Sequence, residues 1–150
     1  DCTYCYLQTY LNQPMTTFYV NEDDIYAQVR QLCERPPVAQ LRIGTGELSD
    51  SLALDPITEF SVQLARVMSQ YKNVRLELKT KSANIEQLFQ LEPEYRKNVV
   101  ISWSMNPPEI IEREEHGTAR FNERLAAAAR VADAGFGVAI HFDPVIFTPN

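Results

Sequence analysis

Apolar residues recur along this chain with two spacings, one typical of helices and one typical of strands. From Glu22 to about Glu34 the apolar spacing is helical, which predicts a helix with Asn21 as its N-cap that stops before Pro36 and Pro37. Further helices are expected from Asp55 to Met68, from Asn84 to Phe89, and from Thr118, as the cap, to Ala134. Strands are expected at about 40–44, 74–80, 99–104 and 136–142.

Strands that alternate with helices predict parallel βαβ units, and hence an α/β fold. The polar motifs of the chain fall at the carboxyl ends of these strands, where parallel α/β folds place their active sites. Trp103 and Cys33 are expected in the core, and Lys79 on the side of its strand away from the motifs. The charged run around His116 is expected to be a solvated loop.

Composition narrows the class of protein. The 150 residues are 45% hydrophobic and 23% charged, which indicates one globular domain, and no apolar run approaches a membrane span. Three cysteines, an odd number, favour a reducing cytoplasm over a disulfide scaffold. A net charge of −6 is unfavourable for nucleic acid, so any DNA contact is expected through regions outside this segment. Both ends are expected to be cut from a longer protein.

The main candidate for chemistry is the pair Cys2 and Cys5, in the sequence Cys-Thr-Tyr-Cys-Tyr-Leu-Gln. A C-x-x-C pair can be a redox couple, half of a zinc site or part of an iron–sulfur site. The redox interpretation requires a helix cap after the pair, and none is visible in the sequence. The zinc interpretation requires two more soft ligands, but the remaining Cys33, His116 and His141 have no ligand spacing. The iron–sulfur interpretation requires a third cysteine three residues before Asp1.

The residues around the pair resemble the cluster loop of radical S-adenosylmethionine (SAM) enzymes, and within them the spore photoproduct lyase family. The sequence Cys-Thr-Tyr-Cys-Tyr-Leu-Gln-Thr carries the resemblance, and later segments follow in the same order as in that family: 41–50, 78–82, 101–106, 112–118 and 141–144. The resemblance covers almost the whole chain. It implies a partial parallel (β/α)6 barrel in which strands about two to five are present and the first strand is missing.

The resemblance also implies two cofactors, a [4Fe–4S] cluster and SAM. Cys2 and Cys5 would be two of three cluster ligands, which leaves one iron open for the amino and carboxylate groups of SAM. An electron from the cluster would then cleave SAM to a 5′-deoxyadenosyl radical. The residues implied to contact SAM or the substrate are Glu47, Ser49, Asp50, Lys81, Ser102 and His141, with weaker indications for Ser104 and Asn106.

Spore photoproduct lyases repair a UV-induced thymine lesion in DNA, and a cysteine just before a Ser-Asp pair donates hydrogen to the product radical. In this chain Glu47 or Leu48 takes that place, so the hydrogen-donor cysteine is lacking. Tyr4 and Tyr6 match tyrosines that assist catalysis in the family and are the expected catalytic residues.

Three hypotheses follow. The first is a radical SAM lyase that acts on DNA or nucleotide lesions, with a tyrosine as hydrogen donor. The second is a radical SAM enzyme with a different, non-DNA substrate. The third is a non-catalytic iron–sulfur or zinc module. The two enzymatic hypotheses imply an electron donor such as flavodoxin or ferredoxin, and no hypothesis involves a membrane.

Overall fold

A computed structural model describes residues 2–10, 15–35 and 40–147. The strands are β1 (Leu41–Thr45), β2 (Val74–Thr80), β3 (Val99–Ser104) and β4 (Gly137–His141). The helices are α1 (Leu7–Tyr10), α2 (Glu22–Cys33), α3 (Asp55–Thr58), α4 (Phe60–Met68), the 3₁₀ helix η1 (Glu86–Gln90), α5 (Pro93–Arg96), α6 (Pro108–Glu114) and α7 (Phe121–Asp133). No helix among the described residues is long and apolar enough to cross a membrane.

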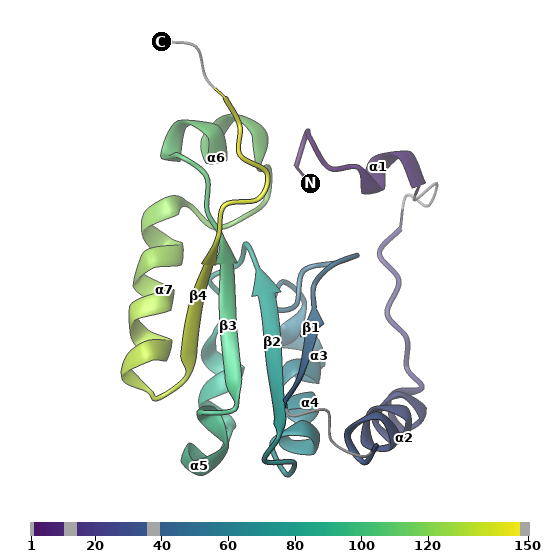
Figure 1. The fold of residues 1–150 in the computed structure, drawn as a ribbon. Helices are drawn as coiled ribbons and strands as arrows, with labels where there is room; N and C mark the ends of the chain where they lie inside the picture. The colour runs from purple at the N-terminus through teal and green to yellow at the C-terminus, as the bar shows by residue number, and fades with distance from the viewer. Residues whose placement is uncertain (1, 11–14, 36–39, 148–150) are drawn as a thin grey trace.

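The four strands form one parallel sheet in the order β1-β2-β3-β4, which confirms the predicted α/β class (Figure 1). Parallel register places Leu76, Val99 and their alternate neighbours on one face of the sheet. Glu77, Val100 and Gly137 are aligned on the other face. The first face is covered by helices, whereas the second carries polar side chains, among them Glu77, Ser102 and His141.

The hydrophobic core lies between the sheet and the helices behind it in Figure 1. Trp103 of β3 is fully buried, as predicted, and its indole N–H donates to the carbonyl of Ser82 at 2.9 Å. Cys33 is also buried, at the end of α2, as predicted. Because Ser82 follows β2, the Trp103 hydrogen bond fixes the loop at the carboxyl end of that strand.

The helix predicted from Asp55 to Met68 is broken in two at Glu59, which has a left-handed backbone (φ 51°). The Asp55 carboxylate explains the break, since it accepts hydrogen bonds from the backbone N–H of Ser61, at 2.9 Å, and from the Ser61 hydroxyl. The side chain thus caps the second helix from six residues upstream. Burial raises the pKa of Asp55, against the opposing effect of these hydrogen bonds.

The other helix boundaries differ from the prediction for local reasons. The cap of α7 is Arg120, not Thr118, and the backbone N–H of Arg120 donates to Glu123 Oε2 at 2.6 Å. Asn21 precedes α2 but makes no side-chain capping bond. Two short helices, α5 and α6, were not predicted, although both begin at proline, a residue favoured in the first turn of a helix. The helix predicted from Asn84 to Phe89 is instead the 3₁₀ helix η1, Glu86–Gln90, which begins two residues later.

The carboxyl ends of the four strands, α6 and the N-terminal segment with α1 all lie at one end of the molecule (Figure 1). This arrangement brings the cysteine motif, from the start of the chain, to the edge of the sheet where the predicted site residues emerge.

Candidate functional site

Cys2 and Cys5 lie on one tight turn at this end of the sheet. The backbone N–H of Cys5 donates to the carbonyl of Cys2 at 3.0 Å, and the side-chain amide of Gln8 donates to the same carbonyl at 2.6 Å. The one-turn helix α1 follows directly, although no helix cap is visible in the sequence after the pair. Both thiols are free and half-buried. The turn therefore carries two soft ligands three residues apart.

This donor set fits part of an iron–sulfur site. Within the described segments no three histidine, cysteine or acidic residues are grouped as a complete metal site. A cluster on this turn would thus need ligands beyond these two thiols, and the third cysteine before Asp1 stays a prediction. Thiolates are the ligands of iron–sulfur clusters, and incomplete ligation leaves an iron open to a cofactor.

The two predicted catalytic tyrosines differ in environment. The Tyr4 hydroxyl donates to Glu115 Oε1 at 2.5 Å, and the ring is half-buried. Burial, followed by this hydrogen bond, raises the pKa of Tyr4 well above its ordinary value. Tyr6 is 54% exposed and makes an edge contact with the Tyr10 ring, with centroids 6.1 Å apart. Tyr6 is thus accessible to a ligand, whereas the Tyr4 hydroxyl is already occupied.

The loop after β1 carries Glu47 and Ser49 to the surface. Its turn depends on Gly46 (φ 87°), where an added Cβ would lie 2.4 Å from the carbonyl oxygen of Lys79. The Glu47 carboxylate lies 3.9 Å from the Lys79 ammonium and its side chain is 79% exposed. Lys79 also reaches Asp143 at 3.5 Å, so the prediction that Lys79 lies on the side away from the motifs is wrong. Register places Lys79 on the same face as Ser102.

Asp50 and Lys81 are held together at the carboxyl ends of β1 and β2. One carboxylate oxygen of Asp50 accepts from the N–H groups of Leu52 and Ala53, both at 2.9 Å, and from the Thr80 hydroxyl at 2.6 Å. The other oxygen accepts from the Lys81 backbone N–H at 2.6 Å. Asp50 therefore organises both loops through its side chain. The Lys81 ammonium makes no ion pair within the described segments, which leaves it available for a ligand carboxylate.

The polar residues of β3 are all buried. The Ser102 hydroxyl is fully buried and makes no hydrogen bond of normal geometry in the described part of the chain. It nevertheless lies close enough to Glu77 to help lower the pKa of that carboxyl. The Asn106 amide donates to Glu115 at 2.9 Å. The role of Ser102 as a SAM contact stays a prediction.

His141, at the end of β4, pairs with a residue that the sequence analysis did not select. Its Nε2 lies 2.8 Å from Glu77 Oε1, while Arg42 Nε donates to Glu77 Oε2 at 2.9 Å. Burial opposes ionisation of Glu77, but the hydrogen bonds from His141 and Arg42 outweigh it and hold the pKa below its ordinary value. Glu77 therefore links three strands across the polar face of the sheet.

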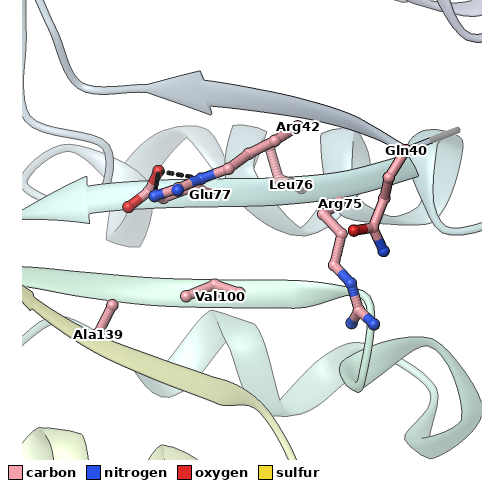
Figure 2. A pocket seen from close by; sticks show the side chains of 7 residues that line it. All are labelled: Gln40, Arg42, Arg75, Leu76, Glu77, Val100 and Ala139. Atoms are coloured by element: carbon pink, nitrogen blue, oxygen red, sulfur yellow. Dashed lines mark hydrogen bonds and ion pairs between the residues drawn. The ribbon is translucent and has the colours of Figure 1, made fainter. Parts of the chain in front are cut away.

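The polar face is hollowed next to this carboxylate, in a pocket of about 300 Å³ (Figure 2). Figure 2 shows Arg42 reaching along the sheet to Glu77, with Arg75 and Gln40 near the amino ends of the strands. Val100 and Ala139 form the apolar floor. The pocket lies on the same face as Ser102 and His141, but nearer to the beginning of the strands.

Two further residues of the site, Glu115 and Arg124, were not predicted from the sequence. Glu115 is 3% exposed and Arg124 is fully buried. The charged residues around Glu115 had predicted a solvated loop. The fact that residues 112–118 belong to the ordered segments of the resemblance was the one signal that could have identified Glu115. His116, in contrast, is exposed as expected.

Comparison with known proteins identifies the family. The profile of the family described as "Spore photoproduct lyase" matches residues 1–150. The spore photoproduct lyase of a Geobacillus species is 30% identical over 145 residues, which cover 96% of this chain and 42% of the relative. That of Clostridium acetobutylicum is 29% identical and covers 99% of this chain and 44% of the relative. The chain thus spans less than half the length of these relatives.

Solved structures of spore photoproduct lyases also resemble this chain. A spore photoproduct lyase complexed with dinucleoside spore photoproduct superposes with a TM-score of 0.90 at 30% identity, over 98% of this chain and 43% of that one. A spore photoproduct lyase variant with bound AdoMet and dinucleoside spore photoproduct also superposes with a TM-score of 0.90 at 30% identity, over 99% of this chain and 43% of that one. These matches confirm the predicted partial barrel of radical SAM type. The chain belongs to the spore photoproduct lyase family.

Proposed function

We propose that the protein containing this chain is a radical SAM enzyme, related to spore photoproduct lyase, that acts on UV-induced thymine lesions in DNA. The observation that carries the proposal is the position of the Cys2–Cys5 turn, at the same end of the sheet as Glu47, Lys81 and His141. The relative solved with AdoMet and dinucleoside spore photoproduct supports both the cofactor and the substrate class.

In this proposal Cys2 and Cys5 supply two of the three thiolates that hold a [4Fe–4S] cluster. When bound, the cluster would supply the electron that cleaves SAM to methionine and a 5′-deoxyadenosyl radical. Glu47 would accept a hydrogen bond from the SAM ammonium group, and Lys81 would pair with its carboxylate. Ser49 and Ser102 would line the SAM site, and Asp50 would fix the two loops on which Glu47 and Lys81 stand. His141, held by Glu77, would face the adenosyl or substrate side.

Hydrogen transfer back to the product is the step in which this chain departs from the family. In this proposal Glu47 or Leu48 takes the place of the family's donor thiol, and neither side chain donates a hydrogen atom as a thiol does. Tyr6 follows Cys5 directly and is accessible, at 54% exposure, and we propose it as the donor. DNA contacts through regions outside this chain and an electron donor such as flavodoxin or ferredoxin belong to the same proposal.

The test uses the full-length protein, reconstituted anaerobically with iron and sulfide and then reduced in the presence of SAM and a spore-photoproduct dinucleotide. Mass spectrometry should detect both 5′-deoxyadenosine and the repaired thymidine dinucleotide, and Tyr6→Phe should reduce the second product more than the first. The substitution of the donor thiol favours one alternative, a radical SAM enzyme with a non-DNA substrate. Formation of 5′-deoxyadenosine without repaired dinucleotide would support that alternative. Absence of both from a protein with a full cluster would leave only the non-catalytic module.

A further inference from the structure

A fully buried ion pair lies directly beneath the cysteine turn. The side chains of Glu115 and Arg124 are both 0% exposed, and Arg124 Nη2 lies 2.5 Å from Glu115 Oε2. A buried ion pair contributes little net stability, because desolvation of both charges offsets their attraction. The role of this pair therefore has to be sought in what it holds in place.

Arg124 binds the segment between β3 and α7. Its Nη1 donates to the carbonyl of Ser104, the last residue of β3, at 2.8 Å. Its Nε donates to the carbonyl of Ala119 at 2.8 Å, and Nη2 donates to the Thr118 hydroxyl at 2.7 Å. The rigid guanidinium thus fixes the position of Glu115 relative to the carboxyl end of β3.

Glu115 uses its other oxygen to bind the cysteine turn. Glu115 Oε1 accepts from the Tyr4 hydroxyl at 2.5 Å, and from the Asn106 amide at 2.9 Å. The backbone adds an antiparallel bridge between Cys2 and Glu115, and the Thr3 N–H donates to the carbonyl of Glu114 at 2.9 Å. Tyr4 lies between the two cysteines, so these contacts hold the part of the chain that carries both thiols.

Little apolar packing holds this turn. The helix that follows it, α1, has no buried residue, and Tyr10 is 74% exposed. Loops with few buried apolar contacts open at low free-energy cost unless polar contacts tie them down. The turn therefore depends on its polar contacts with the segment from Glu114 to Arg124.

We propose that Glu115 and Arg124 are positioning residues, which fix the cluster-binding turn on the end of β3 through the Tyr4 hydroxyl. The inference rests on the proposed function for the identity of the bound group, but the anchor itself is a property of the chain without cofactors. It assigns Tyr4 to positioning the ligands, which leaves hydrogen donation to Tyr6.

The test compares Tyr4→Phe with Tyr26→Phe in the full-length protein. Tyr26 is the matched control, because its hydroxyl also donates to a carboxylate, Glu22 Oε2, at 3.0 Å, but on α2. In the iron-free protein, Tyr4→Phe should accelerate hydrogen exchange of the amides of residues 3–9, whereas Tyr26→Phe should leave them unchanged. In the reconstituted protein without SAM or substrate, Tyr4→Phe should release iron to a chelator about tenfold faster, as expected when a hydrogen bond to a charged group is lost.

Glu115→Gln should loosen the same amides, and its combination with Tyr4→Phe should add little, because the two residues act through one contact. Circular dichroism would verify that the variants remain folded. The proposal would be overturned if Tyr4→Phe exchanged its amides and released iron at the same rates as the wild type and Tyr26→Phe, whatever the effect on repair. Protected amides in a wild-type protein that takes up no iron would support the anchor while refuting the proposed function.

Discussion

Gly46 offers the sharpest test of how the loop after β1 is built. An alanine there would adopt φ 87°, and its Cβ would lie 2.4 Å from the Lys79 carbonyl oxygen and 2.8 Å from the Ser51 hydroxyl. The carbonyl cannot retreat easily, because it accepts the Ser51 N–H at 3.1 Å. The left-handed backbone costs about 1–2 kcal/mol for a residue other than glycine. Overpacking against fixed atoms adds about 1–3 kcal/mol.

Gly135 is the matched control, since it has φ 92° but an added Cβ would meet nothing within 4 Å. Gly135→Ala should therefore reduce the free energy of unfolding by about 1–2 kcal/mol, the cost of the backbone alone. Gly46→Ala should reduce it by about 2–5 kcal/mol, from the two contributions together. Urea-induced unfolding would measure both, and calorimetry should show weaker SAM binding for Gly46→Ala alone. Equal urea midpoints for the two variants would refute the close approach of this loop to β2.

Three further predictions concern buried groups. The ionised Glu77 stabilises the wild type above about pH 5, and this contribution is lost as the pH falls through the lowered pKa of Glu77. Glu77→Gln lacks the contribution at every pH, so the urea midpoints of the two proteins should converge in acid. Arg124→Met should destabilise by about 3–5 kcal/mol because it leaves the Glu115 carboxylate buried without a counter-charge, and adding Glu115→Gln should recover part of this loss. Trp103→Phe should cost about 1–3 kcal/mol, since the Ser82 carbonyl loses its donor. The first prediction would be contradicted if the urea midpoints of wild type and Glu77→Gln stayed equally far apart at every pH. The second would fail if the double variant were no more stable than Arg124→Met, and the third if Trp103→Phe left the midpoint unchanged.

The sheet could be predicted from the sequence because its signals are local. All four strands lie within a residue or two of the expected positions, since alternation and apolar runs reflect burial directly. The break at Glu59 could not be predicted, because glutamate is a good helix former and the apolar face continues across it. The break depends on the side chain of Asp55, which caps the second helix at Ser61, six residues further along the chain.

Site residues that belong to a sequence motif could be predicted, whereas those placed by tertiary contacts could not. The spacing of Cys2 and Cys5 marks them as a candidate pair, and the residues around them, which resemble the family's cluster loop, favour the iron–sulfur interpretation. Glu115 lies in a run of charges that resembles a solvated face, and its burial depends on Arg124, nine residues later, and on Tyr4, 111 residues earlier. Glu77 alternates with apolar residues, as any solvent-facing position of a strand does, and only the sheet reveals His141 and Arg42 beside it.

The most direct test of the account is the metal content of the reconstituted full-length protein, measured with its electron paramagnetic resonance spectrum before and after addition of SAM. The account predicts about four irons per chain, as for one [4Fe–4S] cluster. It also predicts a spectrum of the reduced cluster that changes when SAM binds the open iron, and loss of both properties in Cys2→Ala and Cys5→Ala. Zinc in place of iron, or a full cluster whose spectrum is indifferent to SAM, would contradict the account.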